Sequence, residues 1–185
     1  RQRQMCIRDR RTIPHLCLPS AQGVLAQLSA HAHCVHKDRV WSDWLALERQ
    51  KDASPEMRAR AIWLVTRTFV RAGHTRLAVR FAERHASSAP AQGTQLLNTL
   101  LTGILEDTRK CRSVHDRTCV LRHMYECVWQ AARRSQANTM PTLPVLPELV
   151  SSAPSRAAQR VLWLLARVER LINTHALCPN VHTLQ

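Results

Sequence analysis

Glycine is scarce in this chain, with only four among 185 residues. Loops that cradle phosphates need several glycines at fixed spacing, and neither GxGxxG nor GxxxxGK followed by Ser or Thr occurs. Long apolar runs are also missing, since the run from Val161 to Ile172 is interrupted by Arg167, Glu169 and Arg170. We therefore expect neither a P-loop or dinucleotide-binding fold nor a segment that spans a membrane.

Acidic residues are few, with 13 Asp and Glu against 27 Lys and Arg, which gives a formal charge of +14 and an isoelectric point near 11.0. The neighbours Glu106 and Asp107 read as an exposed helix end rather than as an acid/base couple. No GxSxG, HExxH or Cys-His signature of a nucleophilic site occurs. We expect a protein that is not an enzyme and that binds an anionic partner.

Seven cysteines, without a hydrophobic signal segment, argue against a secreted disulfide framework and favour reduced thiols. Five thiols and imidazoles nevertheless recur every four residues: Cys111, His115, Cys119, His123 and Cys127. Each such step drifts by about 40° around a helix, so at most two or three of them can meet one ion. A zinc site would need further ligands, for which His31, His33, Cys34 and His36 are available. With no CxxC pair, we expect no zinc and no other cofactor; Cys111, His115 and Cys119 are the candidates if a metal binds.

Helical periodicity dominates the chain, and strand-like alternation is hard to find, so we predict an all-α fold. The predicted helices cover about residues 21–35, 39–51, 56–71, 75–87, 93–106, 110–136 and 154–175. Ser54 before Pro55 is a helix start signal, and Gly73 fits a left-handed position at a helix end. Residues 138–154 contain four prolines and read as an extended strap, after which Pro154 opens the last helix.

These signals divide the chain into a leader (1–20), a helical-repeat domain (21–136), a proline-rich linker (137–153), a C-terminal docking helix (154–175) and a tail (176–185). Residues 1–10 resemble translated sequencing-adapter sequence. Up to Lys37 the only acid is Asp9, and this Arg-containing, acid-poor leader resembles the end of a mitochondrial transit peptide. A merely basic loop is the alternative.

One stretch resembles a pentatricopeptide-type repeat. Residues 62–84, IWLVTRTFVRAGHTRLAVRFAER, contain a first helix, a turn at Gly73, and Ala78 and Phe81 on a second helix, and LNTLLTGIL at 97–105 resembles the start of a next repeat. The match is partial, over about residues 57–106, and tetratricopeptide and octotricopeptide arrays fit nearly as well. The resemblance implies a short α-solenoid of helix hairpins whose relatives bind organellar RNA.

Arginines gather on the faces of three predicted helices opposite their apolar sectors. The buried, apolar sector of the predicted helix at 56–71 is expected to contain Ala61, Ile62, Val65, Phe69 and Ala72. That of the helix at 75–87 is expected to contain Ala78, Phe81 and Ala82, and that of the helix at 154–175 Ala157, Ala158, Val161, Leu162, Leu165, Val168 and Ile172. The outward residues, our candidates for RNA contacts, are Arg60, Arg67, Arg71, Arg76, Arg80, Arg84, Arg156, Arg160, Trp163, Arg167 and Arg170. Trp163 has three possible roles: stacking on a base, stacking on a guanidinium, or docking on a neighbouring helix or subunit. The two rows of the first hairpin are expected to converge on one anionic surface.

Together these features favour a non-catalytic RNA-binding structural subunit of an organellar ribonucleoprotein, a mitochondrial ribosomal protein in the matrix that contacts rRNA and neighbouring subunits. Guanidinium forks suit bidentate phosphate contacts, and all but three of the 27 basic residues are Arg, although GC-rich coding also raises Arg. The alternative is an accessory protein-protein interaction subunit of a mitochondrial respiratory or ATP synthase complex, whose Arg faces meet acidic subunits or anionic lipid.

Overall fold

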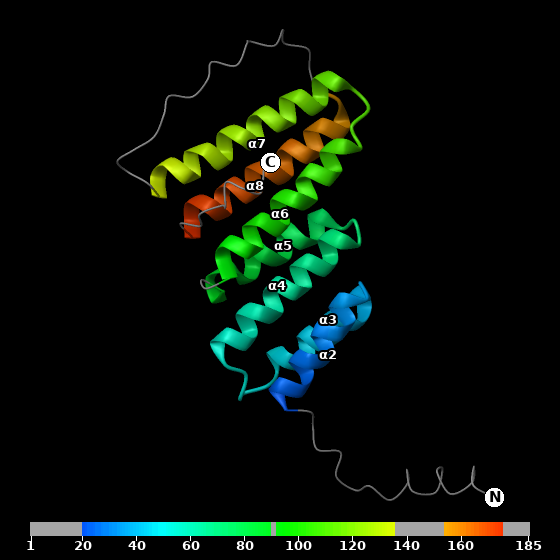
Figure 1. Cartoon of the computed structure of the whole chain (residues 1–185), viewed down its shortest axis with the longest axis vertical. Coiled ribbons are helices and arrows are strands. Elements are labelled where there is room, and N and C mark those ends of the chain that lie inside the picture. The colour runs from blue at the N-terminus through cyan, green and yellow to red at the C-terminus, as the bar shows by residue number, and fades with distance from the viewer. Residues whose placement is uncertain (1–19, 90–91, 136–153, 176–185) are drawn as a thin grey trace, which may run out of the picture.

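The computed structural model describes residues 20–89, 92–135 and 154–175, and within these ranges the chain forms helices and no strands (Figure 1). The elements are α2 (Ala21–His33), α3 (Lys37–Glu48), α4 (Pro55–Arg71), α5 (Thr75–His85), the short 3-10 helix η2 (Ala86–Ser88), α6 (Gly93–Arg109), α7 (Val114–Ser135) and α8 (Arg156–His175). The all-α prediction is confirmed. The predicted leader (but for Ser20), proline-rich linker and tail lie outside the described residues.

Local signals fix several of the helix ends. The Ser54 side chain accepts a hydrogen bond from the Met57 backbone N–H at 3.2 Å, and Gly73 adopts a φ of 75° after α4, both as predicted. Other helix ends differ from the prediction by up to four residues, and two of these differences concern residues singled out in the sequence. Ser155 rather than Pro154 precedes α8, and its hydroxyl accepts from the Ala158 backbone N–H at 3.3 Å. Helix α7 begins at Val114, so Cys111 lies before the helix and not on it.

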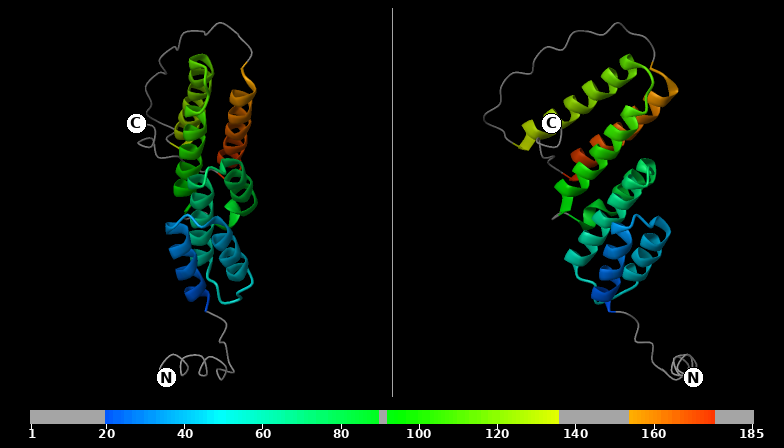
Figure 2. Two further views of the ribbon diagram at one scale, coloured as in Figure 1. Left: turned by 90° about the vertical axis from the view of Figure 1, so that its right-hand side faces the viewer. Right: turned by 45° about the vertical axis from the view of Figure 1, so that its right-hand side comes forward.

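The helices stack in two layers, seen edge-on in Figure 2. One layer contains α2, α4, α6 and α7, and the other contains α3, α5 and α8. Sequential hairpins α2–α3 and α4–α5 pair across the layers, but α6 packs more closely on α8 than on α7, which follows it in the chain. The C-terminal helix therefore occupies the place next to α5 that the second helix of a third hairpin would take.

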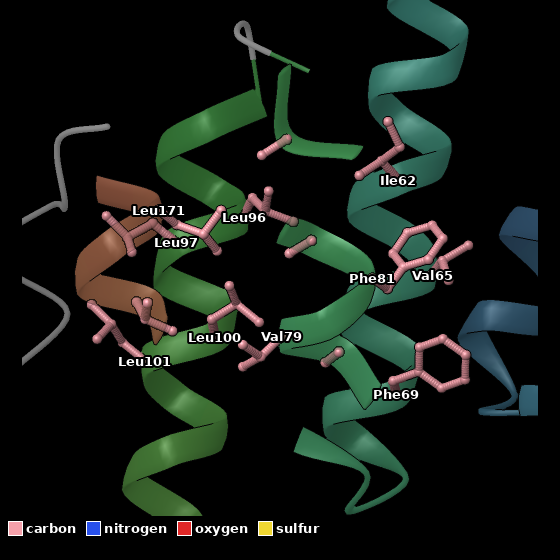
Figure 3. Close-up of a cluster of buried hydrophobic side chains, with 14 of the residues drawn as sticks. Ile62, Val65, Phe69, Val79, Phe81, Leu96, Leu97, Leu100, Leu101 and Leu171 are labelled. Atoms are coloured by element: carbon pink, nitrogen blue, oxygen red, sulfur yellow. The ribbon is translucent and has the colours of Figure 1, made fainter. Parts of the chain in front are cut away.

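Apolar side chains between the layers form one continuous core (Figure 3). Leu97, Val65 and Leu165 are fully buried, and each such side chain contributes about 1.5–3 kcal/mol relative to an exposed position. The predicted apolar sectors are correct except that Ala157 is exposed and Ala72 and Leu162 are half-buried. The sequence reasoning left out Leu164 and Leu171, which are buried because α5, α6 and α7 surround α8 on more than one side.

A glycine permits the closest approach between neighbouring hairpins. A Cβ placed on Gly103 of α6 would lie 2.9 Å from Val70 Cγ1 and 3.0 Å from Thr75 Cγ2. Those two residues flank the turn between α4 and α5, so α6 crosses that turn at Gly103. This packing holds the start of α5, and the basic side chains that follow it, in a fixed position.

Candidate nucleic-acid interface

Helix α5 presents a row of cations on the surface. Arg76, Arg80 and Arg84 are all exposed, and their four-residue spacing places successive guanidinium stems about 6 Å apart along the helix axis. The opposite face buries Ala78 and Phe81 in the core, which fixes the direction in which the row points. None of the three arginines has an acidic partner within 4 Å among the described residues. Their charge is therefore available to an anion.

At its amino-terminal end the row borders a hollow of about 800 Å³ between α5 and α8. Arg76 lines it from α5, and Arg156 and Arg160 line it from α8. Asp107 of α6 also reaches this hollow, but its carboxylate accepts a hydrogen bond from Lys110 Nζ at 2.7 Å. Three of the predicted arginines of α5 and α8 are thus brought together in one hollow, where they outnumber the single carboxylate.

At its other end the row borders a second hollow, of about 410 Å³, between α3 and α5. Arg80 and Arg84 line it together with Lys37, the exposed indole of Trp41 and the carboxylate of Asp38. The Trp41 ring lies on an aromatic floor, with centroids 6.2 Å from Phe69 and 6.0 Å from Phe81. Leu77 borders both hollows, so they form one continuous face. We call it the α3–α5–α8 surface, defined by Lys37, Trp41, Arg76, Arg80, Arg84, Arg156 and Arg160.

Sequence reasoning did not single out Lys37 and Trp41. Both lie on α3, where Val40, Trp44 and Leu47 form the buried face. Lys37 and Trp41 are four residues apart and outside that apolar sector, and this spacing is the signal that would have found them. Trp41 is an exposed aromatic side chain that shares the α3–α5 hollow with Arg80 and Arg84.

Trp163 stacks on guanidinium groups, which is one of the three roles predicted for it. The guanidinium carbons of Arg76 and Arg167 lie 5.4 and 4.9 Å from the centre of its ring. Such cation–π contacts stabilise by about 0.5–2 kcal/mol, more as the site is desolvated. Trp163 is 40% exposed and lines the α5–α8 hollow, where its ring positions Arg76.

Arg167 differs most from its prediction, because it is half-buried and bound within the protein. Its Nε and Nη2 atoms donate to the two carboxylate oxygens of Glu83, and this pairing raises the pKa of Arg167. Glu83 is the single acid between residues 57 and 85. Its ion pair with Arg167 links α8 to α5 and neutralises the charge of Arg167. Arg170 is exposed but borders neither hollow.

The arginines of α4 lie apart from the α3–α5–α8 surface. Arg60 and Arg67 line a different groove, of about 790 Å³, against α2, and the Arg67 guanidinium lies 5.3 Å from the centre of the Trp63 ring. Arg71 is exposed and borders none of these hollows. The expected convergence of the two rows is not observed, because α4 and α5 belong to different layers (Figure 2).

Thiols and imidazoles in the described part of the chain do not form a cluster of three or more with the acids that would hold a metal ion. Cys111 is buried, which raises the pKa of its thiol, and His115 and Cys119 are half-buried on α7. His31 instead pairs with Asp43, at 2.6 Å between Nδ1 and Oδ2, and thereby links α2 to α3.

Residues 20–89, 92–135 and 154–175 also contain no helix with the length and apolar character needed to cross a bilayer. Comparisons of the chain with protein families, with curated proteins and with solved structures found no match.

Proposed function

We propose that this protein is a non-catalytic, RNA-binding structural subunit of an organellar ribonucleoprotein, and that it contacts rRNA of the mitochondrial ribosome through the α3–α5–α8 surface. The observation that carries the proposal is the continuity of the unpaired arginine row of α5 with Arg156 and Arg160 of α8. The organellar setting follows from the resemblance of residues 62–84 and 97–105 to pentatricopeptide repeats.

The chemistry of the surface favours a polyanion over a single small anion. Six cations, Lys37, Arg76, Arg80, Arg84, Arg156 and Arg160, extend across three helices, so they match a run of phosphates better than one phosphate. Guanidinium groups take phosphate oxygens in a bidentate manner, and the exposed Trp41 ring offers a face on which an unpaired base stacks.

The rigid setting supports a scaffold role without turnover. The row lies on a helix whose opposite face is buried, and the Glu83–Arg167 pair fixes α8 beside it. Preorganised cations bind with a smaller loss of side-chain freedom than cations on a mobile loop. The protein therefore presents its charges to RNA in a defined register.

Affinity purification of the tagged chain from mitochondria tests the proposal against the accessory-subunit alternative. We expect ribosomal RNA and ribosomal proteins to co-purify, and the triple variant Arg76→Gln, Arg80→Gln, Arg84→Gln to lose them. A matched variant, Arg60→Gln with Arg71→Gln, removes exposed charge from α4 and should retain them. Recovery of respiratory or ATP synthase subunits without RNA would make the alternative correct.

A further inference from the structure

Helix α7 carries exposed apolar side chains along one face. Val114, Leu121 and Tyr125 are 68%, 40% and 37% exposed, and Thr118 between them is exposed as well. The spacing of four, three and four residues repeats about every 3.5 residues, which keeps these side chains on one side of a helix. We call this set, Val114, Thr118, Leu121 and Tyr125, the α7 stripe.

The position of α7 makes this stripe unusual. Helix α7 lies at one end of the stack, where α6 and α8 pack against it and no other described helix lies beyond it (Figure 1). The end helices of stacked arrays normally have polar outer faces, because no further repeat covers them. An apolar stripe at this place indicates that another helix packs there.

Aromatic stacking gives the stripe a rigid anchor. The Tyr125 ring stacks on Trp129, one turn further along α7, with 6.1 Å between the ring centroids and an interplanar angle of 14°. Large aromatic side chains held in place by a neighbour are typical of the residues that dominate binding energy at interfaces. Tyr125 is therefore placed as the anchor of the contact.

Basic side chains flank the stripe. Arg117 follows Val114 by three residues and precedes Leu121 by four, and Arg122 precedes Tyr125 by three, so each arginine adjoins the stripe. Both are half-buried, and Arg122 also donates to Glu126 at 3.2 Å. The exposed Arg112 and Arg133 extend the positive charge at either end.

These charges argue against a second copy of the chain as the occupant. An antiparallel second α7 that sets Val114 opposite Tyr125 also sets Arg117 opposite Arg122, and a parallel arrangement sets each arginine opposite itself. Like charges directly opposed disfavour the parallel pairing, whereas the antiparallel pairing opposes Arg117 to an arginine that Glu126 already partners. The formal charge of +14 on each whole chain disfavours either pairing. Acidic side chains opposite Arg117 would instead be attracted.

We propose that the α7 stripe docks an amphipathic helix of a partner protein, with its apolar face on Val114, Leu121 and Tyr125 and with Asp or Glu side chains opposite Arg117. This is helix-to-helix recognition by periodic apolar anchors and complementary flanking charge. The proposal does not depend on RNA binding, since the α3–α5–α8 surface belongs to the other layer.

A designed helical peptide supplies the probe. A labelled peptide of four heptads with Leu at the a and d positions and Glu at the flanking e and g positions is titrated with the full chain, and binding is followed by fluorescence anisotropy. One control peptide has Lys in place of the flanking Glu, and another has the same composition in an order that abolishes the repeat. We expect the Glu peptide to bind at least tenfold more tightly than either control.

Protein variants locate the contact. Leu121→Asp should weaken binding of the Glu peptide at least tenfold, and Tyr125→Ala should weaken it to a lesser extent. Leu77→Asp is the matched control, because Leu77 is an exposed leucine on α5, at 47% against 40% for Leu121, and it should leave peptide binding unchanged. Circular dichroism melting curves check that all three variants remain folded.

Four results would overturn the proposal. The first is equal binding of the reordered peptide or of the Leu121→Asp variant. The second is loss of peptide binding in the Arg80→Gln, Arg84→Gln variant, which would place the peptide on the α3–α5–α8 surface. The third is a dimer in sedimentation that Leu121→Asp dissociates, which would make a second copy the occupant. The fourth is a chain that binds the peptide only when the apolar residues of 136–153 are replaced by Ser. That result would mean that residues 136–153 compete with the peptide and are themselves the occupant of the stripe.

Discussion

Salt dependence provides a quantitative test of the α3–α5–α8 surface. If all six of its cations contact phosphates, the slope of log K against log salt for a single-stranded RNA is about −0.7 per contact, or about −4 in total. Replacing Arg80 and Arg84 with Gln removes two contacts and leaves a slope of about −3. Between 50 and 200 mM salt the wild-type protein should then lose about 250-fold in affinity and the double variant about 60-fold.

The matched control removes the same charge from elsewhere. Arg60→Gln with Arg71→Gln changes two exposed arginines of α4, and the salt slope should stay at the wild-type value. Fluorescence anisotropy with a labelled oligonucleotide at five salt concentrations measures all three slopes. Substitutions at exposed positions usually change stability by about 0.5 kcal/mol or less, so folding should not confound the comparison. Equal slopes for the α5 double variant and the wild type, or a reduced slope only for the α4 pair, would refute our placement of the site.

Three further predictions concern the fold. Phe81→Ala should lower the free energy of unfolding by about 3–5 kcal/mol in chemical denaturation, because the buried ring packs on Trp44 and Phe69, and a loss below 1 kcal/mol would contradict this packing. Gly103→Ala should destabilise by about 1–3 kcal/mol, since the clash with Val70 outweighs the gain of about 1 kcal/mol in helix propensity; a raised melting temperature would disprove the close approach. Burial lowers the pKa of His85, and the nearby charge of Arg84 lowers it further while that of Glu48 raises it. The unfolded chain therefore binds a proton at His85 at a higher pH than the folded protein does, so the free energy of unfolding should fall as the pH drops below about 6.5. His85→Leu should flatten that slope between pH 7 and 5, and an unchanged slope would exclude His85 as its source.

Local signals in the sequence were enough to predict the helices. A capping serine before Pro55, a glycine at the left-handed position 73 and apolar residues at helical spacing each act within a few residues of the structure that they specify. Exposure of the α5 row was predictable for the same reason, because Ala78 and Phe81 define the opposite, buried face. The starts of α7 and α8 were predicted four and two residues too early.

Contacts between distant segments were not predictable from periodicity. The Glu83–Arg167 pair joins residues 84 positions apart, so nothing in the local pattern distinguishes Arg167 from Arg160. The insertion of α8 beside α5 and α6 likewise depends on packing across the whole domain, and it explains both the buried Leu171 and the exposed Ala157. The prediction that the arginine rows of α4 and α5 converge was wrong. Two helices that pack through their apolar sectors direct their outer faces away from each other, into different layers.

Crosslinking of RNA to the protein within the native complex tests the central claim most directly. Ultraviolet irradiation of intact mitochondria, followed by purification of the tagged chain and mass spectrometry of its RNA-linked peptides, identifies the residues in contact. Our account predicts crosslinks at Trp41 and within residues 76–84 and 156–160, with none on α4 or α7. Crosslinks confined to the peptides of α4, or purified protein that carries no RNA at all, would contradict it.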